Sequence, residues 1–225
     1  MNRYKNILSI DFSLNGSAMI YGNIQEGVKN YFYFSNIKKD SLNEHCIEVN
    51  KEDKPCNKLD NVICKFLSLI NKVDFVVLES ASFNSLNSTT DFHGGYHIFK
   101  YLCRRLNIEL LEVSPISNKL FFTGNSKADK KEMIKTAVKE FDKEIDFENI
   151  SSKHTEDIAD ALSLYLLGET YLRCYRMSAS KGYCGTSDIK PVQELPLYRK
   201  QVIYKLYGRD DLYKEVVKLR SKYKK

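Results

Sequence analysis

Two apolar runs of this chain each end in a carboxylate at the point where the run should still be covered by the core. Residues 7–10 are mostly apolar and β-branched, which is typical of a buried strand, and Asp11 follows them directly. The continuous apolar run 75–78 leads in the same way into Glu79. Because burying an isolated charge is costly, each of these acids needs a partner. The chain therefore has to fold so that the two strand ends share a counter-charge.

A third apolar segment adds two more acids. The helical stretch 158–167 carries Asp157 and Asp160 at its start, and a spacing of three places both on one helix face. Acids near a helix start also favour the helix dipole, which is a sufficient reading for Asp157 but a weaker one for Asp160 among its apolar neighbours. His154, one turn earlier, is either a surface or capping residue, or a metal ligand or phosphate contact. Four carboxylates on three core elements predict one all-oxygen site suited to Mg²⁺ or Mn²⁺.

The order of the expected elements predicts an α/β fold. Strands joined by short turns come first, and strands separated by helices come later, so antiparallel pairing should give way to parallel pairing. We therefore expect a mixed five-stranded sheet with helices on both faces. The expected strands cover residues 5–12, 18–21, 31–34, 73–78 and 108–113. The expected helices cover residues 57–71, 97–106, 116–122, 128–141 and 155–172. The polar segments 35–57 and 80–95 are expected to be loops, with a short strand over 46–49 as an alternative.

The last quarter of the chain differs from the rest in charge. Residues 171–225 hold 14 Lys and Arg against 5 Asp and Glu, a net charge of +9, whereas the whole chain has +6. The same segment holds 8 of the 15 tyrosines, and basic residues mixed with aromatics suit nucleic-acid phosphates and bases. A solvated helical surface with Tyr in its packing face is the other reading. We expect a core domain over 1–172 and a basic, Tyr-rich helical extension over 173–225, with a linker at 177–187 and helices at 196–207 and 210–223.

Composition excludes several classes of protein. No run approaches the roughly 20 apolar residues of a membrane span, and the N-terminus does not read as a secretion signal, so we expect a cytoplasmic protein without a membrane partner. The six cysteines are then expected to be reduced thiols. A zinc site is the weaker reading, because no Cys-x-x-Cys unit is present. Its residues would come from His45, Cys46, Cys56, Cys174 and Cys184.

Several groups of residues resemble the RuvC-type Holliday junction resolvases, members of the RNase H-like superfamily. The resemblance spans about residues 5–170, and its most specific part is the helical motif from His154 to Leu162. The other matching groups are Ile10-Asp11-Phe12-Ser13-Leu14, Glu79-Ser80-Ala81 with Asn84, Asn87, Ser88 and Gly94-Gly95, and the basic stretch from Val113 to Met133. The basic extension lies outside this resemblance, which suggests a phage or viral member acting in the host cytoplasm.

The resemblance implies a role for each matching residue. Asp11, Glu79, Asp157 and Asp160 would bind two Mg²⁺ ions, with Mn²⁺ as an alternative metal and His154 as a further candidate ligand. The implied contacts to DNA are Phe83, Asn84, Asn87, Lys119, Lys127, Lys130 and Lys131. Family members act as homodimers that nick opposing strands symmetrically, and the helix expected at 97–106 is one candidate interface.

Three functions remain open at this stage. The first is a Mg²⁺-dependent endonuclease that resolves Holliday junctions by hydrolysing phosphodiesters with two metal ions. The second is a related nuclease that cuts forks, flaps or RNA–DNA hybrids. The third is a non-catalytic nucleic-acid-binding module, against which the complete set of four carboxylates argues.

Overall fold

A six-stranded mixed sheet forms the centre of the protein. The computed structural model describes residues 4–14, 16–35, 44–49, 52–80, 90–180 and 190–223. The sheet has the strand order β4-β3-β2-β1-β5-β6. The strands are β1 (Asn6–Asp11), β2 (Ala18–Asn23), β3 (Gly27–Ser35), β4 (Cys46–Glu48), β5 (Phe75–Glu79) and β6 (Glu109–Val113). Pairing is antiparallel along β1, β2 and β3, and parallel between β1 and β5, β5 and β6, and β3 and β4.

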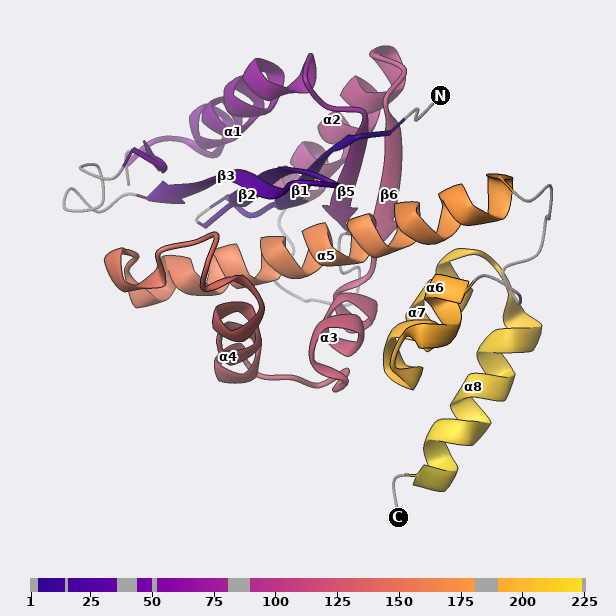
Figure 1. Ribbon diagram of the computed structural model, residues 1–225. Helices are drawn as coiled ribbons and strands as arrows, with labels where there is room; N and C mark the ends of the chain where they lie inside the picture. Colours follow the sequence, from indigo (N-terminus) through magenta and orange to yellow (C-terminus); the bar gives the residue numbers. More distant parts are fainter. Residues whose placement is uncertain are drawn as a thin grey trace.

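Helices cover both faces of this sheet (Figure 1). On one face lie α1 (Pro55–Ile70) and α2 (Thr90–Arg105). The long helix α5 (Ser152–Ser180) crosses the other face, and α3 (Pro115–Thr123) and α4 (Lys130–Phe141) pack against its outer side. A short 3-10 helix, Phe147–Asn149, precedes α5. The expectation of a mixed sheet with helices on both faces is confirmed.

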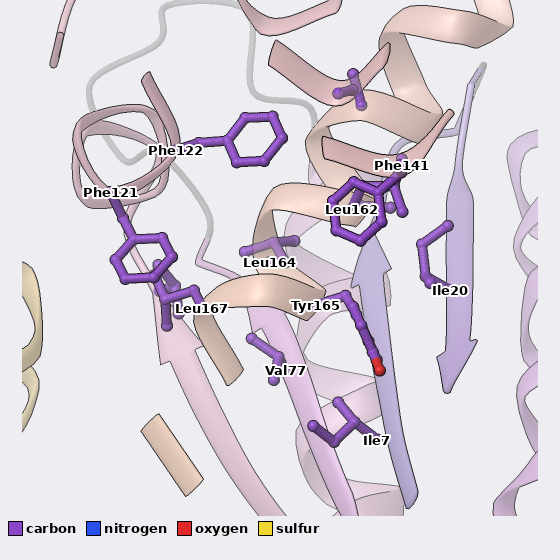
Figure 2. Packing of buried hydrophobic residues seen from close by; sticks show 14 of the residues in the cluster. Ile7, Ile20, Val77, Phe121, Phe122, Phe141, Leu162, Leu164, Tyr165 and Leu167 are labelled. Atoms are coloured by element: carbon purple, nitrogen blue, oxygen red, sulfur yellow. The ribbon is translucent and has the colours of Figure 1, made fainter. Parts of the chain in front are cut away.

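Two apolar cores result from the alternation of side chains along the central strands. In β1, Leu8 and Ile10 join the core under α1 and α2, whereas Ile7 joins the core under α5. Figure 2 shows Leu164 and Tyr165 of α5 near Ile7 and near Val77 of β5. Odd-numbered positions of β1 and β5 therefore face α5, and this parity decides where the strand-end acids point.

The C-terminal helices continue the core under α5. They are α6 (Lys190–Glu194), α7 (Leu197–Leu206) and α8 (Asp210–Tyr223), and the two helices expected near 196–207 and 210–223 are present. Val192, Val202, Ile203 and Val216 are buried in the same apolar cluster as α5. In Figure 1 these helices lie beside α3, on the side of the sheet away from α1 and α2.

The elements differ from the sequence-based expectation in several places. The sheet has six strands rather than five, because the three-residue strand β4, considered only as an alternative, pairs with the edge of β3. Helix α2 begins at Thr90, inside the expected loop. Of its Gly-Gly pair, Gly95 serves packing, because a Cβ there would lie 2.4 Å from the Phe12 ring. Helix α5 runs to Ser180, so residues 177–180 are helical and not part of a linker.

Across the described residues, no helix combines the length and the apolar character needed to cross a membrane.

Candidate metal centre

The parallel pairing of β1 and β5 brings two of the four acids to the same end of the sheet. Ile10 pairs with Leu78, so Asp11 and Glu79 occupy the next position on each strand. Neighbouring strands are about 4.8 Å apart. Both acids sit at odd positions, and the alternation of side chains directs them to the face covered by α5. The carboxyl ends of adjacent parallel strands are a common place for sites in α/β sheets.

Helix α5 supplies the other two acids, and specific contacts fix its position over β1. The Ser9 hydroxyl, fully buried in β1, donates a hydrogen bond of 2.7 Å to the carbonyl of Ala161. This bond holds α5 against the strand two residues before Asp11. The turn after β1 also approaches the helix, because a Cβ on Gly16 would lie 2.6 Å from Asp157 Oδ2. The bond from Ser9 to Ala161 therefore also holds Asp160, the residue before Ala161, close to the end of β1.

The pKa values show that the four acids interact. Burial raises the pKa of Asp11 well above its usual range, and repulsion from Glu79, Asp160 and Asp157 raises it further. The pKa of Glu79 is raised to about 7, mainly by burial and then by the charge of Asp160. Burial also raises the pKa of Asp160 to about 6. The arrangement disfavours four simultaneous negative charges, which a bound cation would offset.

Two polar residues that the sequence analysis did not select support the acids. Asn118 of α3 is fully buried, and its amide Nδ2 lies 3.4 Å from Glu79 Oε1 and 3.5 Å from the carbonyl of Asp160. The buried Ser163 hydroxyl donates to Asn118 Oδ1 and lies 2.9 Å from the same carbonyl. Asn118 thus ties α3 to β5 and α5. The available sequence signal was a polar pair, Ser117 and Asn118, in a short helix that also carries Phe121 and Phe122.

His154 lies beneath the acids. Its side chain is fully buried, its Nδ1 is 3.4 Å from Asp157 Oδ2, and its ring stacks on Tyr33 at a centroid distance of 5.1 Å. The imidazole therefore contacts one of the candidate metal ligands.

The predicted DNA-binding lysines divide into two groups. The charge of Lys119 lowers the pKa values of both Glu79 and Asp160, so its ammonium lies near the acids. Lys130 forms an ion pair with Glu156, and its charge also lowers the pKa of Asp160. Lys127 and Lys131 are exposed on the adjacent α3–α4 turn and the first turn of α4. Phe83, Asn84 and Asn87 lie outside the described residues.

The donor set fits a hard divalent cation. Carboxylate oxygens are the ligands that Mg²⁺ and Mn²⁺ prefer, and the raised pKa values are those expected of buried acids that lie close together. No cluster of three or more His, Cys, Asp or Glu side chains is close-set enough to hold an ion within residues 4–14, 16–35, 44–49, 52–80, 90–180 and 190–223. The four carboxylates are close enough to interact electrostatically, but they are not as close together as the ligands of a bound metal ion.

The cysteines described by the structure are free thiols. Cys56 is exposed on α1, whereas Cys174 is buried in α5 among apolar residues. Cys184, the remaining member of the alternative zinc site, lies outside the described residues.

Solved structures with the same fold are known, although no protein-family model and no curated protein matches the sequence. Thermus thermophilus RuvC in complex with Holliday junction substrate matches with a TM-score of 0.52 and 12% identity, over 72% of this chain and 95% of that chain. The fowlpox virus resolvase, in complex with its substrate Holliday junction DNA, matches with a TM-score of 0.51 and 19% identity, over 74% and 98%. The chain therefore has a RuvC-type, RNase H-like resolvase fold, as its motifs predicted.

Proposed function

We propose that this protein is a Mg²⁺-dependent endonuclease that resolves four-way DNA junctions by phosphodiester hydrolysis. The observation that carries the proposal is the convergence of Asp11, Glu79, Asp157 and Asp160 from β1, β5 and α5. Burial, together with repulsion from neighbouring acids, raises the pKa values of Asp11, Glu79 and Asp160. The RuvC-type fold supports the substrate class, because the two solved resolvases were both captured with Holliday junction DNA.

In this proposal each group has a separate task. The four carboxylates would hold two Mg²⁺, with Mn²⁺ as an alternative, and the ions would supply activation of water and stabilisation of the leaving 3′ oxygen. Asn118 keeps the Glu79 carboxylate turned toward Asp160, and His154 orients Asp157. Lys119 and Lys130 add positive charge beside the acids, where a DNA phosphate would approach.

We further propose that the protein acts as a homodimer, so that paired sites nick opposing strands of one junction. Tyr101 of α2 is 61% exposed and Leu106, directly after the end of the helix, is 45% exposed. Apolar side chains this exposed are suited to an interface. Sedimentation of the purified protein measures this directly, and a monomer at the concentrations that support cleavage would contradict it.

A cleavage assay tests the enzymatic proposal. Labelled four-way junction, fork, flap, linear duplex and RNA–DNA hybrid are incubated with the protein in Mg²⁺. Paired symmetric nicks in the junction are expected, and cutting of forks, flaps or hybrids in preference would support the second function instead. A protein that binds these substrates and cuts none would be a binding module.

A substitution tests the site. Asp160→Asn keeps the size of the side chain but removes a metal-binding charge, so we expect cleavage to fall by at least about a thousandfold with junction binding retained. Asp60→Asn, on the exposed surface of α1, is the matched control and should cut normally. Loss of binding in Asp160→Asn, or normal cleavage by it, would remove Asp160 from the proposed catalytic set.

A further inference from the structure

The basic character of the C-terminal extension is concentrated on one face of α8. Lys214, Lys218 and Lys222 are four residues apart, so they project from the same side of the helix, and all three are exposed. The opposite side of α8 packs into the core through Val216, with Leu212 and Tyr213 against it. Within the described part of the chain, none of the three lysines takes part in an ion pair, so their charges are available to a ligand.

A specific contact places this helix next to the lysines of the candidate site. Arg220 Nη2 donates a hydrogen bond of 2.9 Å to the carbonyl of Gly124, the left-handed residue that ends α3. Arg220 lies between Lys218 and Lys222 in the chain, and Gly124 begins the turn that carries Lys127. The basic end of α8 is therefore fixed beside the α3–α4 turn.

Helix α7 adds further contacts between the extension and α3. The guanidinium of Arg199 lies 5.1 Å from the centre of the Phe121 ring, and its Nε donates to the Phe121 carbonyl at 3.3 Å. The Tyr198 ring lies against Gly124, 3.4 Å from the position a Cβ would take. The extension is held on α3 at several points, so the α8 lysines have a fixed place relative to the acids.

We propose that the Lys214–Lys218–Lys222 face of α8 is a second DNA-binding surface, which holds the phosphate backbone of a duplex arm as it leaves the catalytic site. Lys119 and Lys130 lie near the acids and Lys127 lies on the α3–α4 turn, whereas the lysine face is on the outer side of α8, the helix that Arg220 fixes beside that turn. Eight residues of helix span about 12 Å, which matches the backbone of three to four nucleotides of one strand at about 3.4 Å each. The inference rests on the proposed function for its substrate, since a branched substrate offers arms that extend beyond the cut site.

Charge complementarity selects the occupant. Residues 171–225 carry +9, whereas the whole chain carries only +6, so the positive charge is concentrated in the segment of the sequence that contains this face. Three evenly spaced ammonium groups, with Val217 (38% exposed) and the Arg209-paired Asp211 beside them, suit a phosphate backbone rather than bases. The surface should bind duplex DNA irrespective of sequence.

Salt dependence of binding provides the test. The double variant Lys218→Gln/Lys222→Gln is compared with Lys54→Gln/Lys72→Gln, which removes the same charge at the two ends of α1, on the other face of the sheet. Both are made in the Asp160→Asn background, so that a synthetic four-way junction and a linear duplex stay intact in Mg²⁺. Circular dichroism checks that each variant is folded.

Log affinity falls as log salt concentration rises, and each lost phosphate contact should reduce the size of this negative slope by about 0.9. We therefore expect the α8 variant to lose about 2 in slope on both the junction and the duplex, and the α1 variant to match the parent. Equal slopes for the two variants would overturn the inference, and would leave the α8 face as a solvated or protein-binding surface. If the wild-type chain cuts junctions but the α8 and α1 variants have equal salt slopes, the proposed α8 surface is wrong and the proposed function stands. If it cuts no branched substrate but the α8 variant lowers the duplex slope, the proposed function fails and the α8 surface stands.

Discussion

Neutralising Glu79 should stabilise the metal-free protein, and the gain should depend on pH. Glu79 has its pKa raised from 4.5 to about 7 by burial and by repulsion from Asp160. A carboxyl whose pKa is higher in the folded state favours folding in its protonated form. Ionisation therefore costs the folded state stability, beginning as pH rises above 4.5 and reaching its full extent above about 7.

The magnitude follows from the two pKa values. The difference between 4.5 and about 7 corresponds to about 3 kcal/mol of lost stability at pH 8, and to less than about 1 kcal/mol at pH 5. Glu79→Gln removes the charge and keeps an oxygen that can accept from Asn118 Nδ2. In EDTA the variant should therefore be more stable than the wild type by about 3 kcal/mol at pH 8, and by much less at pH 5.

Urea denaturation at the two pH values measures this effect. Glu48→Gln is the matched control, because Glu48 also ends a strand of the sheet but is exposed. Saturating Mg²⁺ should stabilise the wild type more than Glu79→Gln, since the wild type has the full set of ligands. An increase in the free energy of unfolding that is equal at both pH values, or no increase at pH 8, would show that the ionised Glu79 carboxylate does not destabilise the folded protein.

Three further substitutions probe the packing around the site. Gly16→Ala places a methyl group 2.6 Å from the present position of Asp157 Oδ2, so junction cleavage should fall at least about tenfold while the thermal midpoint changes little; unchanged cleavage would mean that Asp157 can move freely. Gly168→Ala directs a methyl group to within 2.4 Å of Val77 in the core between α5 and β5, and urea denaturation should show a loss of about 1–3 kcal/mol. Arg199→Met keeps much of the side-chain volume but removes the contacts to α3, and should cost about 1–3 kcal/mol by the same measurement, whereas no loss would show that α7 is not anchored there.

The sequence was most informative where a local pattern and a buried charge coincide. Asp11 and Glu79 interrupt apolar runs, and the parallel pairing that brings them together followed from the order of strands and helices. The structure confirms that sheet and places Asp157 and Asp160 over the strand ends, whereas their metal-binding role stays a prediction. This part succeeded because strand periodicity and the cost of burying charge can both be judged from neighbouring residues.

The parts that the sequence did not predict depend on contacts between distant segments. Asn118 acquires its role only because α3 is packed against α5 and β5, and nothing in its own helix indicates those partners. The strand β4 has three residues and exists through pairing with β3. The start of α2 was misread because Gly95 suggested a loop, whereas its missing side chain admits the Phe12 ring. In each case tertiary packing overrides local preference.

The C-terminal helices cannot be treated as a removable tail when the DNA-binding proposal is tested. Val192, Val202 and Ile203 are almost fully buried in the core that also contains Phe121 of α3. Deleting the extension would expose that core and release α3, the helix that carries Asn118 beside Glu79. A truncated protein could then lose cleavage through a displaced carboxylate without any lost DNA contact. Substitutions confined to the exposed face of α8 separate the two effects, because they remove charge while leaving the packing of α7 on α3 in place.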